Sequence, residues 1–202
     1  TGISPGAYKG KIVLTPTEKI NKDNYEFRTA VYIENGKYVQ GKSVAAAVSS
    51  GTVTDTSATD VKITSVGEKF NGIIVTGDIK YSYSIVNPTI KFTGNGANDF
   101  VGYGAAIATA GKAEVTIENA NINNTGAART AIWVGGDSVT RVNNSYIEVH
   151  NGVLPEDYEF SVAPGKMMEV PWMLGTKGNL RATNLADNGT VYYENTHIKA
   201  QG

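Results

Sequence analysis

Residues 115–126 of the chain read VTIENANINNTG, and three of them fall on a spacing that recurs elsewhere in the sequence. The apolar residue Ile117 is followed two positions later by Asn119 and five positions later by Ile122. Four further stretches repeat this spacing, one of them with aspartate at the centre. Five copies in 202 residues indicate a repeated structural unit. The marker residues at the centres of the copies are Asp60, Asn87, Asn119, Asn144 and Asn195.

A second short stretch, mostly apolar, lies twelve residues before each marker. Each unit is therefore expected to contain a strand, a turn, a second strand, the marker and a third strand. The longest interval between markers contains an insertion of about residues 151–179. Self-similarity at intervals of 20–50 residues is typical of solenoids. The residues expected in the first strand of successive units are Val48, Val75, Ile107, Ile132 and Thr183.

The repeat predicts a parallel β-helix, in which each unit stacks on its neighbour at about 4.8 Å. A tight bend between two strands favours asparagine, because this residue tolerates the left-handed backbone conformation. Stacked asparagines can also form hydrogen bonds from unit to unit. A set of antiparallel hairpins explains the turns but not the shared twelve-residue offset. One row of buried side chains is expected to contain Ile90, Ile122, Ile147 and Ile198.

VTIENANI, together with TAIWVGGDSV before VNNSYI, resembles the right-handed β-helices of the pectin-lyase-like superfamily. The resemblance covers about residues 44–202. It implies that GIIV, GAAIA and TAIWV are strands of the first sheet, with the markers at the bend between the second and third sheets. The same architecture hosts lyases, hydrolases, epimerases, esterases, phage tailspikes and adhesins, so it specifies the fold and not the function.

The expected fold is all-β: a right-handed parallel β-helix with an N-terminal cap and one long inserted loop. Residues 1–43 are assigned to the cap, because the pattern around Asn35-Gly36 predicts a β-hairpin. Residues 44–202 are assigned to the stacked units. The final unit ends without a polar cap, so a second polypeptide is expected to continue the solenoid after Gly202. This partner is either the rest of a longer precursor or another copy of the chain.

Composition excludes several classes of function. The formal net charge of −1 and the pI near 6.1 give no basic field for nucleic acid. There is no cysteine, so thiolate chemistry and zinc–thiolate sites are excluded. No apolar run approaches the length of a membrane span. Carboxylates are scattered singly, which disfavours a calcium-dependent lyase, and neither a metal nor a cofactor is predicted.

The candidate site is a groove between the first sheet and the insertion. Arg129 and Arg181 precede strands of adjacent units and suit an acidic sugar, unless they bond loop carbonyls instead. Trp133, Tyr158 and Trp172 suit stacking on sugar rings, unless they pack the core of the loop. Catalytic residues are not identified. The candidates are His150, Asp157, Arg129 and Arg181, and a hydrolase would draw its carboxylates from Glu148, Glu156, Asp157 and Glu159.

Two functional interpretations follow from these patterns. In the first, the chain is a secreted or bacterial cell-surface protein that binds an acidic glycan, and processing of that glycan stays open. In the second, it is a non-catalytic adhesin or structural solenoid. The Met- and Trp-rich insertion favours the first interpretation, whereas the scarcity of paired carboxylates favours the second.

Overall fold

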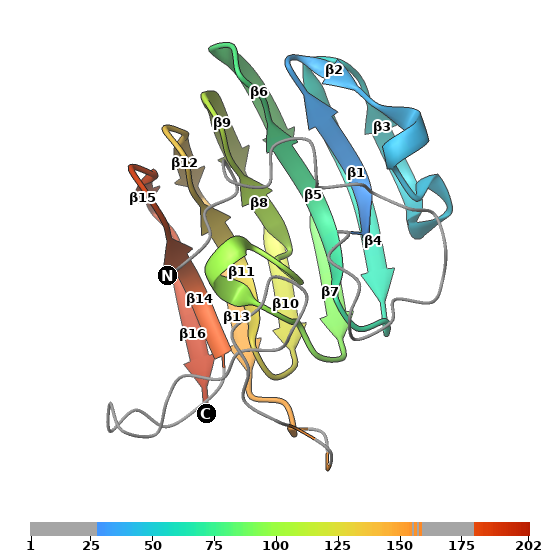
Figure 1. The fold of residues 1–202 in the computed structure, drawn as a ribbon, viewed down its shortest axis with the longest axis vertical. Coiled ribbons are helices and arrows are strands. Elements are labelled where there is room, and N and C mark those ends of the chain that lie inside the picture. The colour runs from blue at the N-terminus through green and yellow to red at the C-terminus, as the bar shows by residue number, and fades with distance from the viewer. Residues whose placement is uncertain (1–27, 155, 157, 159–179) are drawn as a thin grey trace.

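The computed structural model describes residues 28–154, 156, 158 and 180–202 (Figure 1). Regular structure in this part of the chain consists of β-strands and three short 3-10 turns. The turns are η2 (Gln40–Lys42), η3 (Ala45–Ala47) and η4 (Asp99–Val101). The strands are β1 (Arg28–Glu34), β2 (Lys37–Tyr38), β3 (Val48–Val53), β4 (Ser57–Ser65), β5 (Phe70–Thr76), β6 (Tyr81–Val86), β7 (Thr89–Thr93), β8 (Ile107–Thr109), β9 (Ala113–Glu118), β10 (Asn121–Thr125), β11 (Arg129–Val134), β12 (Val139–Asn143), β13 (Tyr146–His150), β14 (Leu180–Leu185), β15 (Thr190–Glu194) and β16 (His197–Gln201).

The strands form two sheets whose order reflects a repeated three-strand unit. The first sheet has the order β14-β11-β8-β5-β1-β2. The second has the order β15-β12-β9-β6-β4-β7-β10-β13-β16, with β3 paired to β4. Each unit contributes one strand to the first sheet and two to the second, and equivalent strands of successive units pair in parallel. The predicted all-β architecture with a large parallel sheet is thus confirmed, and the arrangement is compatible with a β-helix.

The register shows where the twelve-residue offset holds. Ile107, Ile132 and Thr183 occupy one row of the first sheet, as their common offset predicts. Their partner in β5 is Ile73, whereas Val75 pairs two positions further along. The connection from β5 to β6 is longer by two residues than its counterparts, so the expected place of Val75 in this row is wrong.

The first unit also differs from the prediction. Val48 lies in β3, which runs antiparallel to β4, so the expectation of a first-sheet strand at this position is wrong. That strand is β1, which pairs in parallel with β5 and lies within residues 1–43. Val31 and Ile33 of β1 are fully buried in the core, so β1 extends the stack. The hairpin at Asn35-Gly36 is short and joins β1 to β2.

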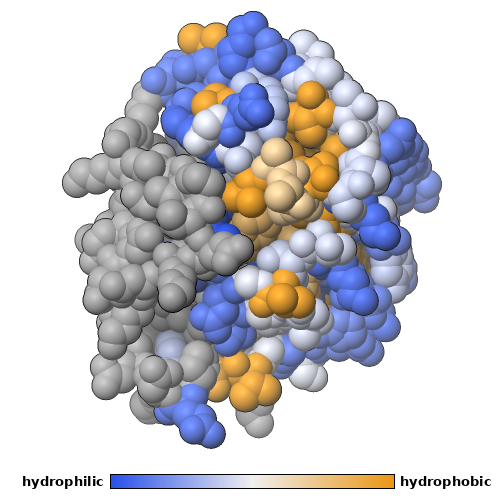
Figure 2. All heavy atoms as spheres, turned by 90° about the vertical axis from the view of Figure 1, so that its right-hand side faces the viewer, coloured by the Kyte–Doolittle hydropathy of each residue, from blue (hydrophilic) through white to orange (hydrophobic). Residues whose placement is uncertain are grey.

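The end of the stack beside β1 is covered by residues between β2 and β4. Val44, Ala47, Val48 and Val53 pack half-buried against the core. Figure 2 looks onto this end and shows apolar side chains gathered between polar ones. The opposite ends of both sheets are formed by β14, β15 and β16 (Figure 1).

Asn87, Asn119, Asn144 and Asn195 lie at the bends between the second and third strands of their units. Asp60 lies at the equivalent point inside β4, between the half that pairs with β6 and the half that pairs with β7. The φ angles of these five markers are all positive, between 46° and 55°, a conformation that asparagine adopts at lower cost than most residues. The side-chain amide of Asn87 donates to Asp60 at 2.8 Å, that of Asn119 to Asn87 at 3.2 Å, and that of Asn195 to Asn144 at 2.6 Å. Asn144 donates its hydrogen bond to Glu118 and not to Asn119, so the ladder has one interruption.

The inward row of the third strands forms the centre of the core. Ile63, Ile90, Ile122 and Ile147 pair in register on successive strands and are at most 1% exposed. Ile198 continues this row on β16, but it is 41% exposed because its strand is the last in the sheet. Burial therefore depends on having a neighbouring unit on each side.

Replacing Asn119 by alanine is expected to lower the free energy of unfolding by about 1–3 kcal/mol. Alanine tolerates the left-handed conformation poorly and cannot donate the bond to Asn87. Asn119→Gly should lose less stability, because glycine adopts positive φ without strain. Urea unfolding of both variants separates strain from hydrogen bonding. An Asn119→Ala variant as stable as the wild type would show that the ladder does not contribute to the free energy of unfolding.

Candidate functional site

The outer face of the first sheet, where sequence reasoning placed a groove, is occupied by the chain itself. The segment 97–105, which includes η4, packs on this face (Figure 1). Its Ala97, Val101, Tyr103 and Ala105 form a second hydrophobic cluster with side chains of the strands beneath. Asn71 holds the segment in place, because its amide donates to the carbonyl of Gly102 at 2.7 Å and accepts from the amide of Gly104 at 3.0 Å. The other members of this cluster are Tyr32, Ile74, Ala108 and Trp133 in the strands and Ala110 directly after β8.

Arg129 is buried at the start of β11, with 1% of its surface exposed. Its guanidinium donates five hydrogen bonds of 2.7 to 3.3 Å to backbone carbonyls, and it lies 5.0 Å from the ring centroid of Phe92. Burial lowers the pKa of Arg129 to about 10. This geometry is the carbonyl-bonding alternative of the sequence analysis, and it removes Arg129 from any open binding surface. The carbonyls that accept these bonds belong to Gly67, Phe70, Gly94, Asn95 and Gly104.

Trp133 and Arg181 lie next to the 97–105 segment. Trp133 is 1% exposed and its ring underlies Gly102, so it is not available for stacking on a sugar. Arg181 of β14 places Nε 2.9 Å from Oδ2 of Asp99, which is fully buried. This contact pairs opposite charges, but neither carboxylate oxygen of Asp99 accepts a hydrogen bond. Arg181 therefore holds η4 against the sheet.

The buried carboxylate of Asp99 should make stability fall as the pH rises. Burial raises its pKa from the ordinary value of 3.8 to about 6, while Arg181 opposes this shift. The folded state then keeps a proton that the unfolded chain has released, so stability present below about pH 4 is lost as the pH approaches 6. Asp99→Asn removes this contribution.

The stability difference between Asp99→Asn and the wild type is expected to change between pH 4 and pH 7.5. The change should favour the variant at the higher pH by on the order of 2–3 kcal/mol. Urea unfolding at the two pH values measures it, and the other acidic groups cancel because both proteins contain them. An equal difference at both pH values would contradict the assignment.

The remaining predicted site residues are not brought together at this face. His150 points outward from β13 in the second sheet, and its ring Nε2 lies 3.0 Å from Oε1 of Glu148. Tyr158 is half-buried. Asp157 and Trp172 lie outside the described residues. The structure thus separates His150 from Arg129, Trp133 and Arg181 by placing it on another sheet.

A different group of side chains is gathered on the outer face of β10, β13 and β16. The rings of Tyr146 and His197 are stacked, with centroids 5.3 Å apart and planes 1° from parallel. Glu148 accepts from Tyr146 at 3.1 Å and from Lys199 at 2.7 Å. The hydrogen bond from Lys199 is the main cause that lowers the pKa of Glu148, and the same bond raises the pKa of Lys199. Ion pair and aromatic pair therefore lie side by side on one open face.

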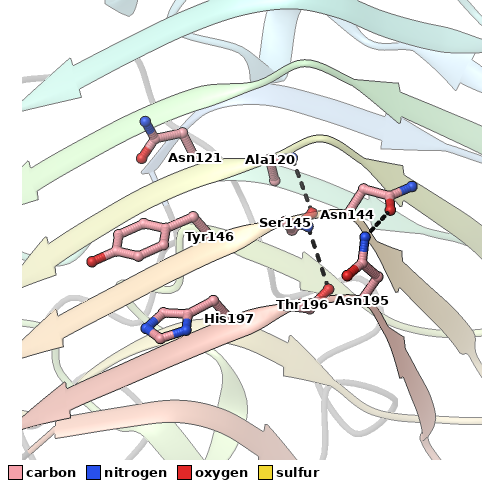
Figure 3. A pocket seen from close by; sticks show the side chains of 8 residues that line it. All are labelled: Ala120, Asn121, Asn144, Ser145, Tyr146, Asn195, Thr196 and His197. Carbon is pink, nitrogen blue, oxygen red and sulfur yellow. Dashed lines mark hydrogen bonds between the residues drawn. The ribbon is translucent and has the colours of Figure 1, made fainter.

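A hollow of about 620 Å³ lies beside the aromatic pair (Figure 3). Figure 3 shows Asn121, Tyr146 and His197 projecting in parallel from three neighbouring strands. The bend residues form the other side of the hollow, where Asn195 donates to Asn144. Polar donors, acceptors and an aromatic edge thus surround a shared space. The remaining lining residues are Ala120, Ser145 and Thr196.

The charge on this face is positive, although the chain as a whole is slightly negative. The outward positions of β7, β10, β13, β16 and the second half of β4 hold three lysines and one carboxylate. The lysines are Lys62, Lys91 and Lys199, and the carboxylate is that of Glu148. Both histidines of the chain also lie here. An acidic ligand would meet an electrostatically favourable surface.

Sequence reasoning missed this face, although the repeat contained a signal for it. Asn121, Tyr146 and His197 each follow a marker by two positions, so they share one row. His197 lies within β16, and its ring stacks on that of Tyr146. Strand alternation assigns this position to the outer face once the marker is placed at the bend.

Metal and membrane sites receive no support from the described residues. Among them, no group of three His, Asp or Glu side chains is arranged to hold a metal ion. No helix in the described part of the chain has the length and apolarity needed to cross a membrane.

Comparison of the chain with protein-family models, with curated proteins and with solved structures finds no match. Any functional interpretation therefore depends on the geometry and chemistry described above.

Proposed function

We propose that the two sheets form a right-handed parallel β-helix of the pectin-lyase-like kind. The recurring three-strand unit, the in-register isoleucine row and the bends with positive φ support this interpretation. Architecture of this kind provides a stiff scaffold, on which outward side chains of successive units repeat at about 4.8 Å. It does not by itself assign an activity.

We propose that the protein binds an acidic glycan on the outer face of β10, β13 and β16, as a secreted or cell-surface protein. The observation that supports this most is the Tyr146–His197 pair beside a hollow on a face with excess lysine. The two rings are stacked on each other, so they present their edges to the hollow, and these edges can contact the C–H groups of a pyranose. Asn121 offers an amide group to hydroxyls, and the exposed Lys91 on the neighbouring strand β7 offers positive charge to a carboxylate or sulfate.

Binding without cleavage is the simpler form of this proposal. A glycoside hydrolase uses two carboxylates about 5–9.5 Å apart. Glu148 is the carboxylate at the outward positions of these three strands, and Lys199 and Tyr146 already bond to it. This observation favours the alternative of a non-catalytic adhesin over an enzyme.

A second proposal concerns partners. β14, β15 and β16 form the edges of the two sheets. Ile198 on β16 and Tyr192 on β15 are 41% and 53% exposed. A further polypeptide that pairs with these edges, either more of a longer precursor or another copy, would bury Ile198 as its row-mates are buried. Exposed strand edges favour such pairing.

Tyr146→Ala tests the glycan proposal. We expect wild-type protein to bind acidic polysaccharides more tightly than neutral ones, with affinity that falls as salt rises. Tyr146→Ala should weaken binding by about tenfold or more, equivalent to about 1.4 kcal/mol. Tyr192→Ala is the matched control, because Tyr192 is an exposed tyrosine on β15 outside the hollow.

Titration calorimetry against a panel of acidic and neutral glycans provides the measurement. Equal loss of affinity in Tyr146→Ala and Tyr192→Ala would refute the location, and failure of every acidic glycan to bind would refute the function. Analysis of the glycans after incubation distinguishes the two classes, because shortened products would establish an enzyme.

A further inference from the structure

The hollow beside Tyr146 runs across the strands and not along one of them. Its lining comes from equivalent positions of three successive units. Ala120, Ser145 and Thr196 each follow a marker by one position, and the next residues are Asn121, Tyr146 and His197. Figure 3 shows these side chains as rungs on three adjacent strands. The long direction of the site is therefore the stacking direction.

Each strand offers one outward side chain to this row, at intervals of about 4.8 Å. This interval is comparable to the length of one pyranose in a polysaccharide. A linear glycan that lies along the stacking direction would therefore meet about one rung with each sugar. A glycan that lies along a single strand would contact only one residue of the row formed by Asn121, Tyr146 and His197. The next residue of that strand points inward.

The row continues beyond the hollow on the Asn121 side. Thr89 of β7 pairs in register with Asn121 and is exposed, and Lys91 is exposed beside it. At the other side, His197 lies on the edge strand β16. A site for a terminal sugar needs a wall that stops the glycan. Here the row leads onto exposed residues of β7 at one side and ends at the open edge of the sheet at the other, among the residues that the structure describes.

We propose that the site recognises an internal stretch of a linear acidic polysaccharide that crosses β10, β13 and β16. This inference rests on the proposed function and adds the form of the ligand: a polymer segment of about three sugars, not a monosaccharide or a chain terminus. Asn121, Tyr146 and His197 each contact a successive sugar, and the exposed Lys91 in the adjacent row faces the acidic groups.

Oligomers of galacturonic acid with one to six residues test the proposal by titration calorimetry. We expect affinity to rise at least tenfold between the monomer and the tetramer and then to level off. A hexamer reduced at its end should bind as tightly as the unreduced one. A monomer that binds as tightly as the hexamer, or a reduced hexamer that no longer binds, would overturn this inference while the proposed function stands.

Variants at the two sides of the row supply an independent test. Asn121→Ala should weaken binding of the hexamer at least threefold more than binding of the dimer, because the dimer can occupy Tyr146 and His197 alone. Thr116→Ala is the control on the exposed face of β9, and it should change neither affinity. Equal effects of Asn121→Ala on both oligomers would overturn the inference. Failure of every oligomer to bind would sink the proposed function, and this inference with it.

Discussion

Arg129→Met is expected to lower the free energy of unfolding by about 3–5 kcal/mol. The guanidinium is buried and donates to carbonyls of five residues in segments that are far apart in sequence. Removing it leaves these carbonyls without a charged donor in a place that water does not reach. Methionine retains most of the apolar contact with Phe92, so the loss measures mainly the hydrogen bonds.

Two further variants make this prediction specific. Arg129→Lys should lose nearly as much stability, because one ammonium group cannot reach carbonyls arranged for a planar fork. Arg141→Met is the matched control, since Arg141 is exposed on β12 and stacks over Tyr192 at 4.6 Å. Urea unfolding of the three variants provides the comparison. Similar small losses in Arg129→Met and Arg141→Met would contradict a structural role for the buried guanidinium.

Ile122→Ala is expected to destabilise the protein by about 2–5 kcal/mol. Ile122 is fully buried between Ile90 and Ile147 on neighbouring strands, so alanine leaves a cavity that the stiff stack cannot close. Ile198→Ala removes the same atoms from the same row at a position that is 41% exposed. Its cost should stay within about 1 kcal/mol, since less of the side chain is shielded from water.

Thermal or urea unfolding of these two variants tests the register of the stack. The ratio of the two losses is informative, because the chemistry of the substitution is identical. Equal losses would mean either that the row is not aligned as described or that Ile198 is covered by another polypeptide in solution. Measurements over a range of protein concentrations distinguish these cases, because pairing between copies depends on concentration.

The repeat was predictable from sequence because its main constraint is local. A bend with positive φ needs asparagine or aspartate at one position, and the isoleucine three residues later needs burial in the third strand. The first unit was not predictable in this way. Its first-sheet strand, β1, is separated from Asp60 by β2 and β3, so the twelve-residue offset pointed to Val48 instead.

The burial of Arg129 and Trp133, which were expected in the binding groove, was less predictable because it depends on distant segments. Arg129 and Trp133 stand at the start and near the end of one strand, and nothing local shows that residues 94–105 fold back over them. Tyr146 and His197 were accessible to prediction, because strand alternation sends the residue two positions after a marker outward. Strand alternation does not predict that the two rings stack on each other.

Hydroxyl-radical footprinting with and without polygalacturonate tests most directly whether the outer face of β10, β13 and β16 is the glycan-binding surface. Tyr146 and His197 are reactive aromatic side chains on this face, and the exposed Tyr192 serves as an internal reference on β15. We expect the polymer to protect Tyr146 and His197 while the reactivity of Tyr192 stays unchanged. Unchanged reactivity of Tyr146 and His197 in the presence of bound polymer, with protection elsewhere, would contradict the placement of the site.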